Sequence, residues 1–298
     1  MAMEASMPKA LILGGATGLL GRPLTAAMAS AGWETESLGR EDGDLLTYEF
    51  LKSRLNDSKP DVVFNTVAWT QVDDAEDHPE EAAKVNRCLP DALSRIIASM
   101  PGVWFGHVST DFVFSAPPGT LLKETDEPNP ESVYGETKLA GEKAIAHNLP
   151  DRSCIIRTAW LFGPGKKNFV KTILNACHKK SQLNVVDDQT GSPTYTLDLA
   201  QWAVALTEKR MTGIWHAVNS GQASWWELAA EASQLIPESC RVMPITTAEW
   251  PQKAKRPANS ALDNTKLANF LGQRPRAWPK ALRDYVYGEF QAEIKEER

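Results

Sequence analysis

The stretch Lys9-Ala-Leu-Ile-Leu-Gly-Gly-Ala-Thr-Gly-Leu-Leu-Gly21 decides the fold of this chain. Its first five residues form an apolar run, as expected for a strand that is buried on both faces of a sheet. Glycines then stand at positions 15, 18 and 21. The spacing of apolar and small residues over 20–31 predicts a helix that ends at Gly32.

A Gly-x-x-Gly-x-x-Gly turn between a strand and a helix is a fingerprint of dinucleotide binding. Glycines let the backbone turn sharply and approach a pyrophosphate, and the helix N-terminus offers free N–H groups to the phosphate charge. The alternative explanation is a tight packing turn. We predict binding of NAD(H) or NADP(H), with contacts from Gly15, Thr17, Gly18, Leu19, Leu20 and Gly21.

Apolar runs and helical patterns alternate along the first half of the chain. Strands are predicted at 34–38, 60–65, 103–108 and 154–157, and helices at 48–55, 79–98 and 134–148. This alternation is what a parallel, doubly wound sheet requires. We therefore predict an α/β fold with a Rossmann-type sheet: an NAD(P)-binding domain over 7–160 and a smaller C-terminal α/β substrate lobe over 161–298, partly interleaved with the sheet. In that lobe, helices are expected at 168–179, 197–208, 224–236 and 279–293, and strands at 184–186 and 214–218.

The residue after the second predicted strand usually meets the adenosine ribose of the cofactor. An acidic side chain there suits a 2′-hydroxyl, and an arginine suits a 2′-phosphate. This chain has Arg40, followed by Asp42 and Asp44. Arg40 favours NADP(H), although a solvated loop charge explains it equally well.

Composition excludes several classes of function. Apolar residues make up 42% of the 298 positions and charged residues 23%, as in ordinary globular proteins, and the net charge is -6. An acidic chain without a basic stripe is not typical of nucleic-acid binding. The apolar runs are too short to span a membrane. Residues 1–9 lack the charged start and apolar core of a signal peptide, so we expect a cytoplasmic protein.

The cysteines and histidines give no sign of a metal site. Four cysteines, at 88, 154, 177 and 240, are far apart and form no Cys-x-x-Cys, so we expect reduced thiols. The five histidines show no metal-ligand spacing, which leaves Mg²⁺ possible but without support. His107 lies in an apolar run, and we expect it to be a packed strand residue.

Tyr134 and Lys138 stand four residues apart at the start of a predicted helix. That spacing puts both side chains on one face. A nearby ammonium lowers the pKa of a phenol, which is about 10 in isolation, and prepares it to exchange a proton with a carbonyl or alcohol oxygen. An ordinary surface helix explains the pair as well. The hydroxyls of Ser109 and Thr110 end the fourth predicted strand, where side chains point into the ligand crevice.

The glycine turn, these hydroxyls, the Tyr134/Lys138 pair and the variable C-terminal half together resemble the extended short-chain dehydrogenase/reductase family over essentially the whole chain. Within it, the chain is similar to the dTDP-4-dehydrorhamnose reductases. The stretches that carry the narrower resemblance are Ser109-Thr-Asp-Phe-Val-Phe114, Val133-Tyr-Gly-Glu-Thr-Lys-Leu-Ala-Gly-Glu142, Arg157-Thr-Ala-Trp160, Asp188-Gln-Thr-Gly-Ser-Pro-Thr194 and Arg256-Pro-Ala-Asn-Ser-Ala-Leu262.

The resemblance implies reduction of the C4 keto group of dTDP-4-dehydro-L-rhamnose with NAD(P)H by a homodimer. Tyr134 would protonate the C4 oxygen, Lys138 would lower the pKa of Tyr134 and hold the nicotinamide ribose, and Thr110 would hydrogen-bond the keto oxygen. Further cofactor contacts would come from Asp44, Leu45, Val67, Ala68 and Trp69. Substrate contacts would come from Thr70, Thr110, Trp160, Arg256 and Ser260. Arg256 suits a diphosphate, and a large core aromatic is the other explanation for Trp160.

Two other functions stay open. A nucleotide-sugar 4,6-dehydratase or epimerase shares the fold, but elimination usually needs an acidic pair directly after the threonine. Here the pair is Asp111-Phe112, so the second carboxylate is missing. A non-catalytic, NADP-binding regulatory subunit similar to the β subunit of methionine adenosyltransferase is the second alternative. The chain also has Asp74 where the reductases often have a lysine, so we expect a change in the loop over the site or in a subunit contact.

Overall fold

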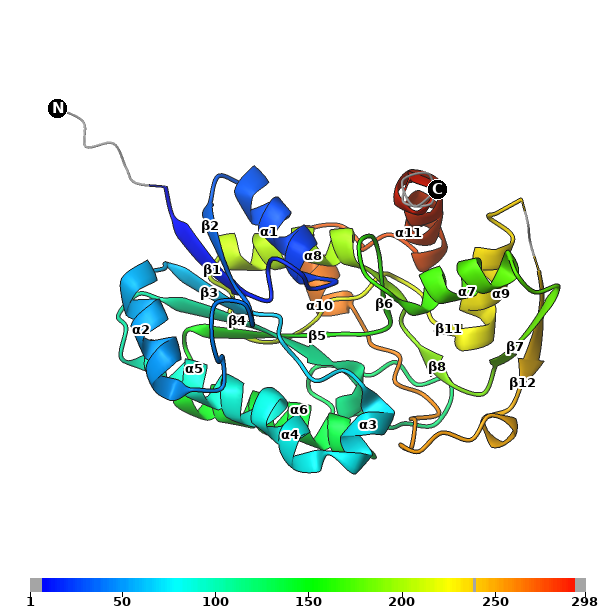
Figure 1. Cartoon of the computed structure of the whole chain (residues 1–298), viewed down its shortest axis with the longest axis horizontal. Coiled ribbons are helices and arrows are strands. Elements are labelled where there is room, and N and C mark those ends of the chain that lie inside the picture. Colours follow the sequence, from blue (N-terminus) through cyan, green and yellow to red (C-terminus); the bar gives the residue numbers. More distant parts are fainter. Residues whose placement is uncertain (1–6, 238–239, 293–298) are drawn as a thin grey trace.

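The computed structural model of this chain describes residues 7–237 and 240–292. Six parallel strands form the central sheet in the order β10-β5-β4-β3-β1-β2 (Figure 1). The sheet therefore grows in both directions from β1, and the predicted doubly wound parallel sheet is confirmed. The strands are β1 (Lys9–Leu13), β2 (Glu34–Leu38), β3 (Val62–Asn65), β4 (Trp104–Thr110), β5 (Ser153–Thr158) and β10 (Gly213–His216).

Helices cover both faces of the sheet because residues along each strand alternate between two cores. Ala10 and Ile12 pack in one core with α1 (Gly21–Ser30) and α8 (Thr196–Glu208). Leu11 and Leu13 pack in the other core, whose helices are α2 (Tyr48–Ser58), α5 (Leu89–Ala98) and α6 (Val133–Asn148). Figure 1 shows these two layers on opposite sides of the strands. A sheet covered in this way leaves its carboxyl edge open to a ligand.

The helix predicted at 79–98 is interrupted. It consists of α4 (Pro79–Ala83), a π-helical turn η1 (Lys84–Cys88) and α5, and a short helix α3 (Val72–Asp77) that the sequence pattern did not indicate precedes it. Asn86 lies in the π-helical turn and binds the backbone of Trp69 in both directions, with Oδ1 accepting from its N–H at 2.9 Å and Nδ2 donating to its carbonyl at 3.2 Å. The widened turn thus fixes the segment that follows β3.

The C-terminal half builds a smaller lobe with its own apolar core. Its main elements are α7 (Phe169–Cys177), β7 (Gln182–Val186), α9 (Trp225–Ser233), β12 (Arg241–Ile245), α11 (Trp278–Asp284) and the π-helical turn η4 (Tyr285–Phe290). Strand β12 pairs in parallel with β7 and was not predicted, and neither was α10 (Thr265–Leu271). Strand β10 belongs to the main sheet and α8 packs against it, although both come after residue 160 in the sequence. The division of the chain at residue 160 therefore stays a prediction.

Short elements complete the fold. They are η2 (Asp111–Val113), β6 (Leu161–Phe162), β8 (Thr190–Gly191), β9 (Thr194–Tyr195), β11 (Ala223–Ser224) and η3 (Thr247–Glu249). None of the helices in residues 7–237 and 240–292 combines the length and hydropathy that a membrane crossing requires. Most of the residues on which the signal-peptide expectation rests, 1–6, lie outside the described residues.

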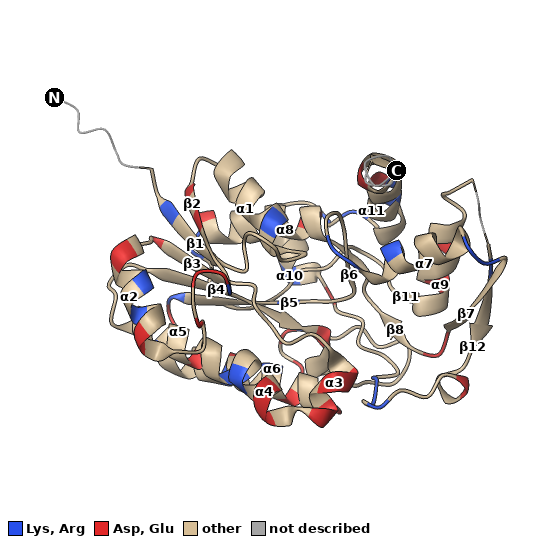
Figure 2. Cartoon of the chain, in the orientation of Figure 1, with Lys and Arg blue, Asp and Glu red and all other residues tan. Residues whose placement is uncertain are grey.

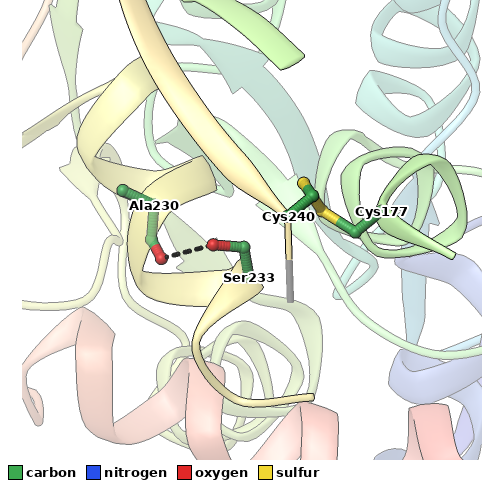
Figure 3. The surroundings of a disulfide bond; sticks show 4 residues. All are labelled: Cys177, Ala230, Ser233 and Cys240. Carbon is green, nitrogen blue, oxygen red and sulfur yellow. Dashed lines mark hydrogen bonds between the residues drawn. A yellow bond between two sulfur atoms is a disulfide. The ribbon is translucent and has the colours of Figure 1, made fainter. Parts of the chain in front are cut away.

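The expectation that all four cysteines are reduced is wrong for one pair. Cys177 at the end of α7 and Cys240 just before β12 form a disulfide (Figure 3). The two residues are 63 positions apart in the sequence, so no local motif reveals their pairing. They meet because α7 and β12 belong to the same small core. Cys88 and Cys154 remain free thiols.

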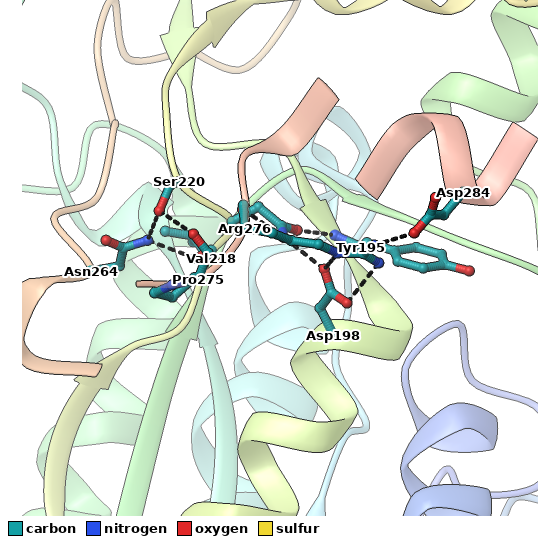
Figure 4. Close-up of polar contacts among 9 residues, drawn as sticks. Tyr195, Asp198, Val218, Ser220, Asn264, Pro275, Arg276 and Asp284 are labelled. Atoms are coloured by element: carbon teal, nitrogen blue, oxygen red, sulfur yellow. Dashed lines mark hydrogen bonds and ion pairs between the residues drawn. The ribbon is translucent and has the colours of Figure 1, made fainter. Parts of the chain in front are cut away.

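Arg276 ties the last part of the chain to α8. Its guanidinium binds both carboxylate oxygens of Asp198, at 2.7 and 2.8 Å, and also pairs with Asp284 of α11 (Figure 4). The same guanidinium lies over the Tyr195 ring, 5.6 Å from its centre. A planar guanidinium held in two directions fixes the angle at which α11 leaves the main domain.

The helix that carries Tyr134 and Lys138 is attached to the sheet by a buried ion pair. Arg157 of β5 donates to Glu142 of α6 from Nε at 3.0 Å and from Nη2 at 2.6 Å, and both side chains are almost fully buried. The Arg157 guanidinium also lies 4.9 Å from the centre of the Phe114 ring. Glu142 and Arg157, which belong to the stretches that carry the family resemblance, thus hold α6 in position and take no part in the chemistry.

We expect Glu142→Gln to lower the free energy of unfolding by about 3 kcal/mol, because it leaves the Arg157 charge buried without its partner. The double variant Glu142→Leu/Arg157→Met removes both charges and should lie close to the wild type. Urea denaturation measures both. Arg95→Ala, which breaks an exposed pair with Asp91, is the control and should change stability by less than about 1 kcal/mol. A double variant as unstable as the single one would contradict this account.

Candidate active site

A cavity of about 960 Å³ opens at the carboxyl ends of the parallel strands. The turns after β1, β2, β3, β4 and β5 all contribute to its wall, and the small lobe closes it from the other side. This is the position at which doubly wound sheets bind ligands. Its volume lies at the upper end of the range for ligand sites, which leaves room for more than one bound molecule.

The glycine-rich turn has no space for side chains. Gly14 has φ +80°, and a Cβ on Gly21 would lie only 2.0 Å from the carbonyl oxygen of Gly14. A Cβ on Gly18 would meet the same oxygen at 2.8 Å. The turn therefore brings bare backbone to the cavity at the start of α1, as binding of a dinucleotide pyrophosphate requires. Thr17, Leu19 and Leu20 line the cavity beside it.

Helix α6 brings Tyr134 and Lys138 to the cavity wall. Ser132 caps its first turn by accepting from the N–H of Gly135 at 3.2 Å. The helix passes so close to η2 that a Cβ on Gly135 would lie 2.3 Å from the carbonyl oxygen of Phe112. A glycine is therefore required at this position. Tyr134 and Lys138 both line the cavity, as predicted from their spacing, and are 9% and 1% exposed.

Lys138 does not lower the pKa of Tyr134 in this arrangement. Burial raises the pKa of Tyr134 to about 12, and a hydrogen bond with Thr110 opposes that rise. The ammonium of Lys138 instead donates to the carbonyl of Val108 at 2.6 Å. The predicted direction was therefore wrong. A phenol with a high pKa stays protonated at neutral pH and so keeps the hydrogen that a general acid gives away.

Thr110 sits in a polar network at the end of β4. Its hydroxyl donates to Asp111 at 3.2 Å and accepts from the N–H of Phe112 at 3.2 Å. Since a hydroxyl has one hydrogen, donation to Asp111 competes with donation to a substrate oxygen. Asp111 is buried and also accepts from Ser260 at 2.5 Å, and burial raises its pKa to about 6 against these hydrogen bonds.

Trp160 reaches the cavity through an unusual backbone conformation. Its φ of 46° is rare for a large side chain, and strain of this kind gathers at functional sites. The indole stacks on Trp225 with ring centres 3.5 Å apart and planes 5° apart. A Cβ on Gly191 would lie 2.3 Å from the indole, so that glycine is needed to admit it. The tryptophan pair forms an apolar wall of the cavity.

Arg256 enters the cavity from a segment that is fastened to α3. Acidic residues are frequent along α3 and α4 (Figure 2). One of them, Asp73, accepts from Arg256 Nη2 and from the N–H of Ala254, both at 2.9 Å. Lys253 pairs with Asp77 nearby. The remaining amino group of Arg256, Nη1, is buried and has no hydrogen-bond partner in the part of the chain that the structure describes. Asp74 lies 3.6 Å from His78 on the surface, so the fastening uses its neighbour Asp73.

The structure brings most of the predicted site residues to one cavity. Those that line it are Thr17, Gly18, Leu19, Leu20, Arg40, Leu45, Val67, Ala68, Thr70, Thr110, Tyr134, Lys138, Trp160 and Arg256. Five do not line it: Gly15, Gly21, Asp44, Trp69 and Ser260. The first two are packing glycines of the turn, Asp44 accepts hydrogen bonds from Leu46 and Thr47, and Ser260 holds Asp111. The roles assigned to individual residues stay predictions.

Sequence reasoning missed part of the wall. Trp225, Phe169 and Trp250 add aromatic surface, and Lys166 and Lys167 add positive charge from the loop after β6. The signal for the lysines was present in Gly163-Pro-Gly-Lys-Lys167, where a glycine-rich loop carries two adjacent cations. Nothing local pointed to Trp225, because its contact with Trp160 joins residues that are 65 positions apart. Within the described ranges, no group of three His, Cys, Asp or Glu residues converges to hold a metal.

A doubly wound sheet with a glycine-rich turn, and a buried Tyr–Lys pair on the same cavity, define an oxidoreductase of the short-chain dehydrogenase/reductase type. The family model described as the RmlD substrate binding domain matches residues 9–289, and the chain belongs to that family. The predicted resemblance and the predicted class of enzyme are both confirmed.

Individual relatives agree with this assignment. The chain is 38% identical to the dTDP-4-dehydrorhamnose reductase of Streptomyces griseus over 90% of each protein. It is similar to a crystal structure of a dTDP-4-dehydrorhamnose reductase from Clostridium acetobutylicum, with a TM-score of 0.89 and 35% identity over 94% of this chain and 98% of the other. The enzyme of that name from Bacillus anthracis, solved in complex with NADP, gives a TM-score of 0.89 at 26% identity over 94% and 99%.

Asp111 should make stability depend on pH between about 4 and 6. Its pKa is 3.8 in an ordinary setting and about 6 in the folded chain, so within this window the folded chain keeps a proton that the unfolded chain has released. The contribution of Asp111 to the free energy of unfolding therefore falls as the pH rises, by at most about 1.4 kcal/mol per unit. Asp111→Asn should abolish this decline.

Urea denaturation of the wild type and Asp111→Asn from pH 4 to 8 measures the difference. Ser260→Ala is the companion variant. It removes a hydrogen bond that lowers the pKa of Asp111, so the decline should extend to higher pH. Parallel stability curves for the wild type and Asp111→Asn would show that the carboxyl group titrates normally.

Proposed function

We propose that this chain reduces the C4 keto group of dTDP-4-dehydro-L-rhamnose to give dTDP-L-rhamnose, with NADPH or NADH, in nucleotide-sugar and polysaccharide biosynthesis. The observation that carries the proposal is the convergence of Tyr134, Lys138 and Thr110 on the cavity that the glycine-rich turn also lines. Membership of the reductase family supports it. We place the enzyme in the cytoplasm, and a homodimer stays an expectation.

The residues present fit a dinucleotide. Gly14 and Gly18 leave a cradle that a Cβ would fill. The hydroxyls of Ser109 and Thr158, two residues of the cavity wall, are buried and have no partner within residues 7–237 and 240–292. When bound, NAD(P)H supplies the hydride that reaches C4. Lys138 is placed to hold the nicotinamide ribose, and Tyr134 holds its phenolic hydrogen for the C4 oxygen at which negative charge develops.

The substrate side of the cavity fits a nucleoside diphosphate sugar. Lys166, Lys167 and the unpartnered Nη1 of Arg256 offer positive charge for the diphosphate. The tryptophan pair offers a flat apolar surface beside them. The missing second carboxylate after Thr110 argues against elimination chemistry, because Phe112 occupies that position on the cavity wall.

We expect Tyr134→Phe to reduce kcat by about 10²- to 10⁴-fold, because the variant has no hydrogen to give to the C4 oxygen. Binding of NADPH should survive, since the ring keeps its volume. Oxidation of NADPH at 340 nm in the presence of dTDP-4-dehydro-L-rhamnose measures turnover, and fluorescence titration measures cofactor binding. Tyr287→Phe, at an exposed position, is the control. Full activity of Tyr134→Phe would remove the phenol from the mechanism. No turnover by the wild type would favour a regulatory protein.

Arg40 should set the preference between the two cofactors. It lines the cavity just after β2, where the adenosine ribose is expected. Arg40→Ala removes a charge that can pair with a 2′-phosphate, so kcat/KM with NADPH should fall about tenfold relative to that with NADH. Arg95→Ala, on the outer surface of α5, should leave the ratio unchanged. An unaltered ratio in Arg40→Ala would show that Arg40 is only a solvated loop charge.

A further inference from the structure

Behind the Tyr134/Lys138 pair, three buried polar side chains form a row. Asn65 ends β3, His107 lies opposite it in β4, and Lys138 reaches them from α6; none is more than 1% exposed. Asn65 Nδ2 lies 3.2 Å from His107 Nδ1, and His107 Nε2 lies 3.4 Å from Lys138 Nζ. The row connects the centre of the sheet to the proposed catalytic lysine.

The backbone decides how the Asn65 amide points. The N–H of Val67 lies 3.0 Å from Asn65 Oδ1. Because a backbone N–H can only donate, the side-chain atom that faces it must be the oxygen. The NH₂ group of Asn65 therefore faces His107. An NH₂ group also only donates, so Nδ1 of His107 must be an acceptor without a hydrogen, and the ring of a neutral His107 must carry its hydrogen on Nε2.

This tautomer turns an N–H, rather than a lone pair, toward Lys138. A neutral amine can accept from that N–H, but an ammonium has no lone pair with which to do so. Among the described residues, the ammonium has one acceptor at short distance, the carbonyl of Val108 at 2.6 Å. Glu142 lies one turn further along α6 and is already bound by Arg157. The buried charged or titratable groups on α6 and on β4, β5 and η2, which pack against it, are Tyr134, Glu142, His107, Arg157, Cys154 and Asp111. Of these, Glu142 attracts the ammonium and raises its pKa.

We propose that Asn65 and His107 are positioning residues for Lys138, and that they present a fixed ring N–H to its amine instead of an acceptor. The inference rests on the proposed function, because it assigns a purpose to Lys138. The contact directs the hydrogens of the ammonium away from the ring and toward the Val108 carbonyl and the cavity, and it favours release of a proton near neutral pH. Burial lowers the pKa of Lys138 to about 8, against the attraction of Glu142, in agreement with this.

The tautomer of His107 is measurable without substrate. Long-range ¹H–¹⁵N spectra of the wild type should show a hydrogen on Nε2 and none on Nδ1 throughout pH 5 to 8, since burial also lowers the pKa of this ring well below its usual range. His216 is an internal control, because its hydrogen is expected on the other ring nitrogen. Its Nδ1 faces the carbonyl of Leu122 at 3.0 Å, so its hydrogen belongs on Nδ1. Signals lost in His107→Gln and in His216→Gln assign the two rings.

Kinetics test the effect on Lys138. In the proposed reaction Lys138 holds the nicotinamide ribose as an ammonium, which donates hydrogen bonds. Activity of the wild type should therefore fall as the pH rises through about 8 and the ammonium loses its proton. His107→Leu removes the opposing N–H, and Lys138 should hold its proton more tightly, which moves this decline upward by about one pH unit. His107→Gln keeps an N–H at the same distance from the backbone and should keep the decline near 8. If His107→Leu only loosened the packing, it would lower kcat and leave the midpoint of the alkaline decline in activity unchanged.

Two results would overturn the proposal. One is a His107 ring that carries its hydrogen on Nδ1 or takes up a second proton between pH 5 and 8. The other is an alkaline midpoint that is unchanged in His107→Leu, or that moves equally in His107→Gln. Because the spectra need no substrate, failure of the proposed reaction would leave the tautomer result standing and would be recognised separately.

Discussion

Helix α6 is held to the sheet by the buried pair of Glu142 and Arg157, and the geometry of the site follows from that attachment. Tyr134, Lys138 and Glu142 stand at intervals of four residues, so they share one face of the helix. Fixing Glu142 to β5 therefore sets the rotation of α6 and aims the other two side chains at the carboxyl edge of the sheet. A buried ion pair adds little net stability, but it tolerates few geometries, and here that restriction serves the position of a phenol and an amine.

Much of the main domain could be predicted because its signals are local. The last four residues of the strand Lys9–Leu13 are apolar and buried. The glycines that follow it stand where a Cβ atom would collide with the backbone or with neighbouring side chains. The spacing of Tyr134 and Lys138 predicted that they share one face of a helix, and both side chains line the same cavity. The pKa of Tyr134 could not be inferred from the same spacing, because burial in the folded chain is the main cause of its rise. The acceptor that the ammonium of Lys138 finds, the carbonyl of Val108, also lies in another element.

The small lobe was harder to predict because its structure depends on contacts between distant segments. Strand β12 (Arg241–Ile245) contains a proline, and none of its five residues is fully buried, so it does not resemble the buried apolar run of β1. Its partner β7 lies about sixty residues earlier, and so does the cysteine that pairs with Cys240. The bond between Asp111 and Ser260 spans 149 residues. No periodic pattern encodes such pairings, because each joins segments that meet only when the chain folds.

The residue Trp160, just after β5, has a strained backbone because the cavity wall requires a conformation that a large side chain rarely adopts. Trp160 adopts φ 46°, and a residue of this size reaches that region only when its surroundings enforce it. The indole of Trp160 stacks on Trp225, and Gly191 has no side chain that would collide with it. Both come from the small lobe. The aromatic wall of the site is therefore built by the assembly of the two halves, and a substitution at Gly191 should disturb Trp160 before it disturbs the fold.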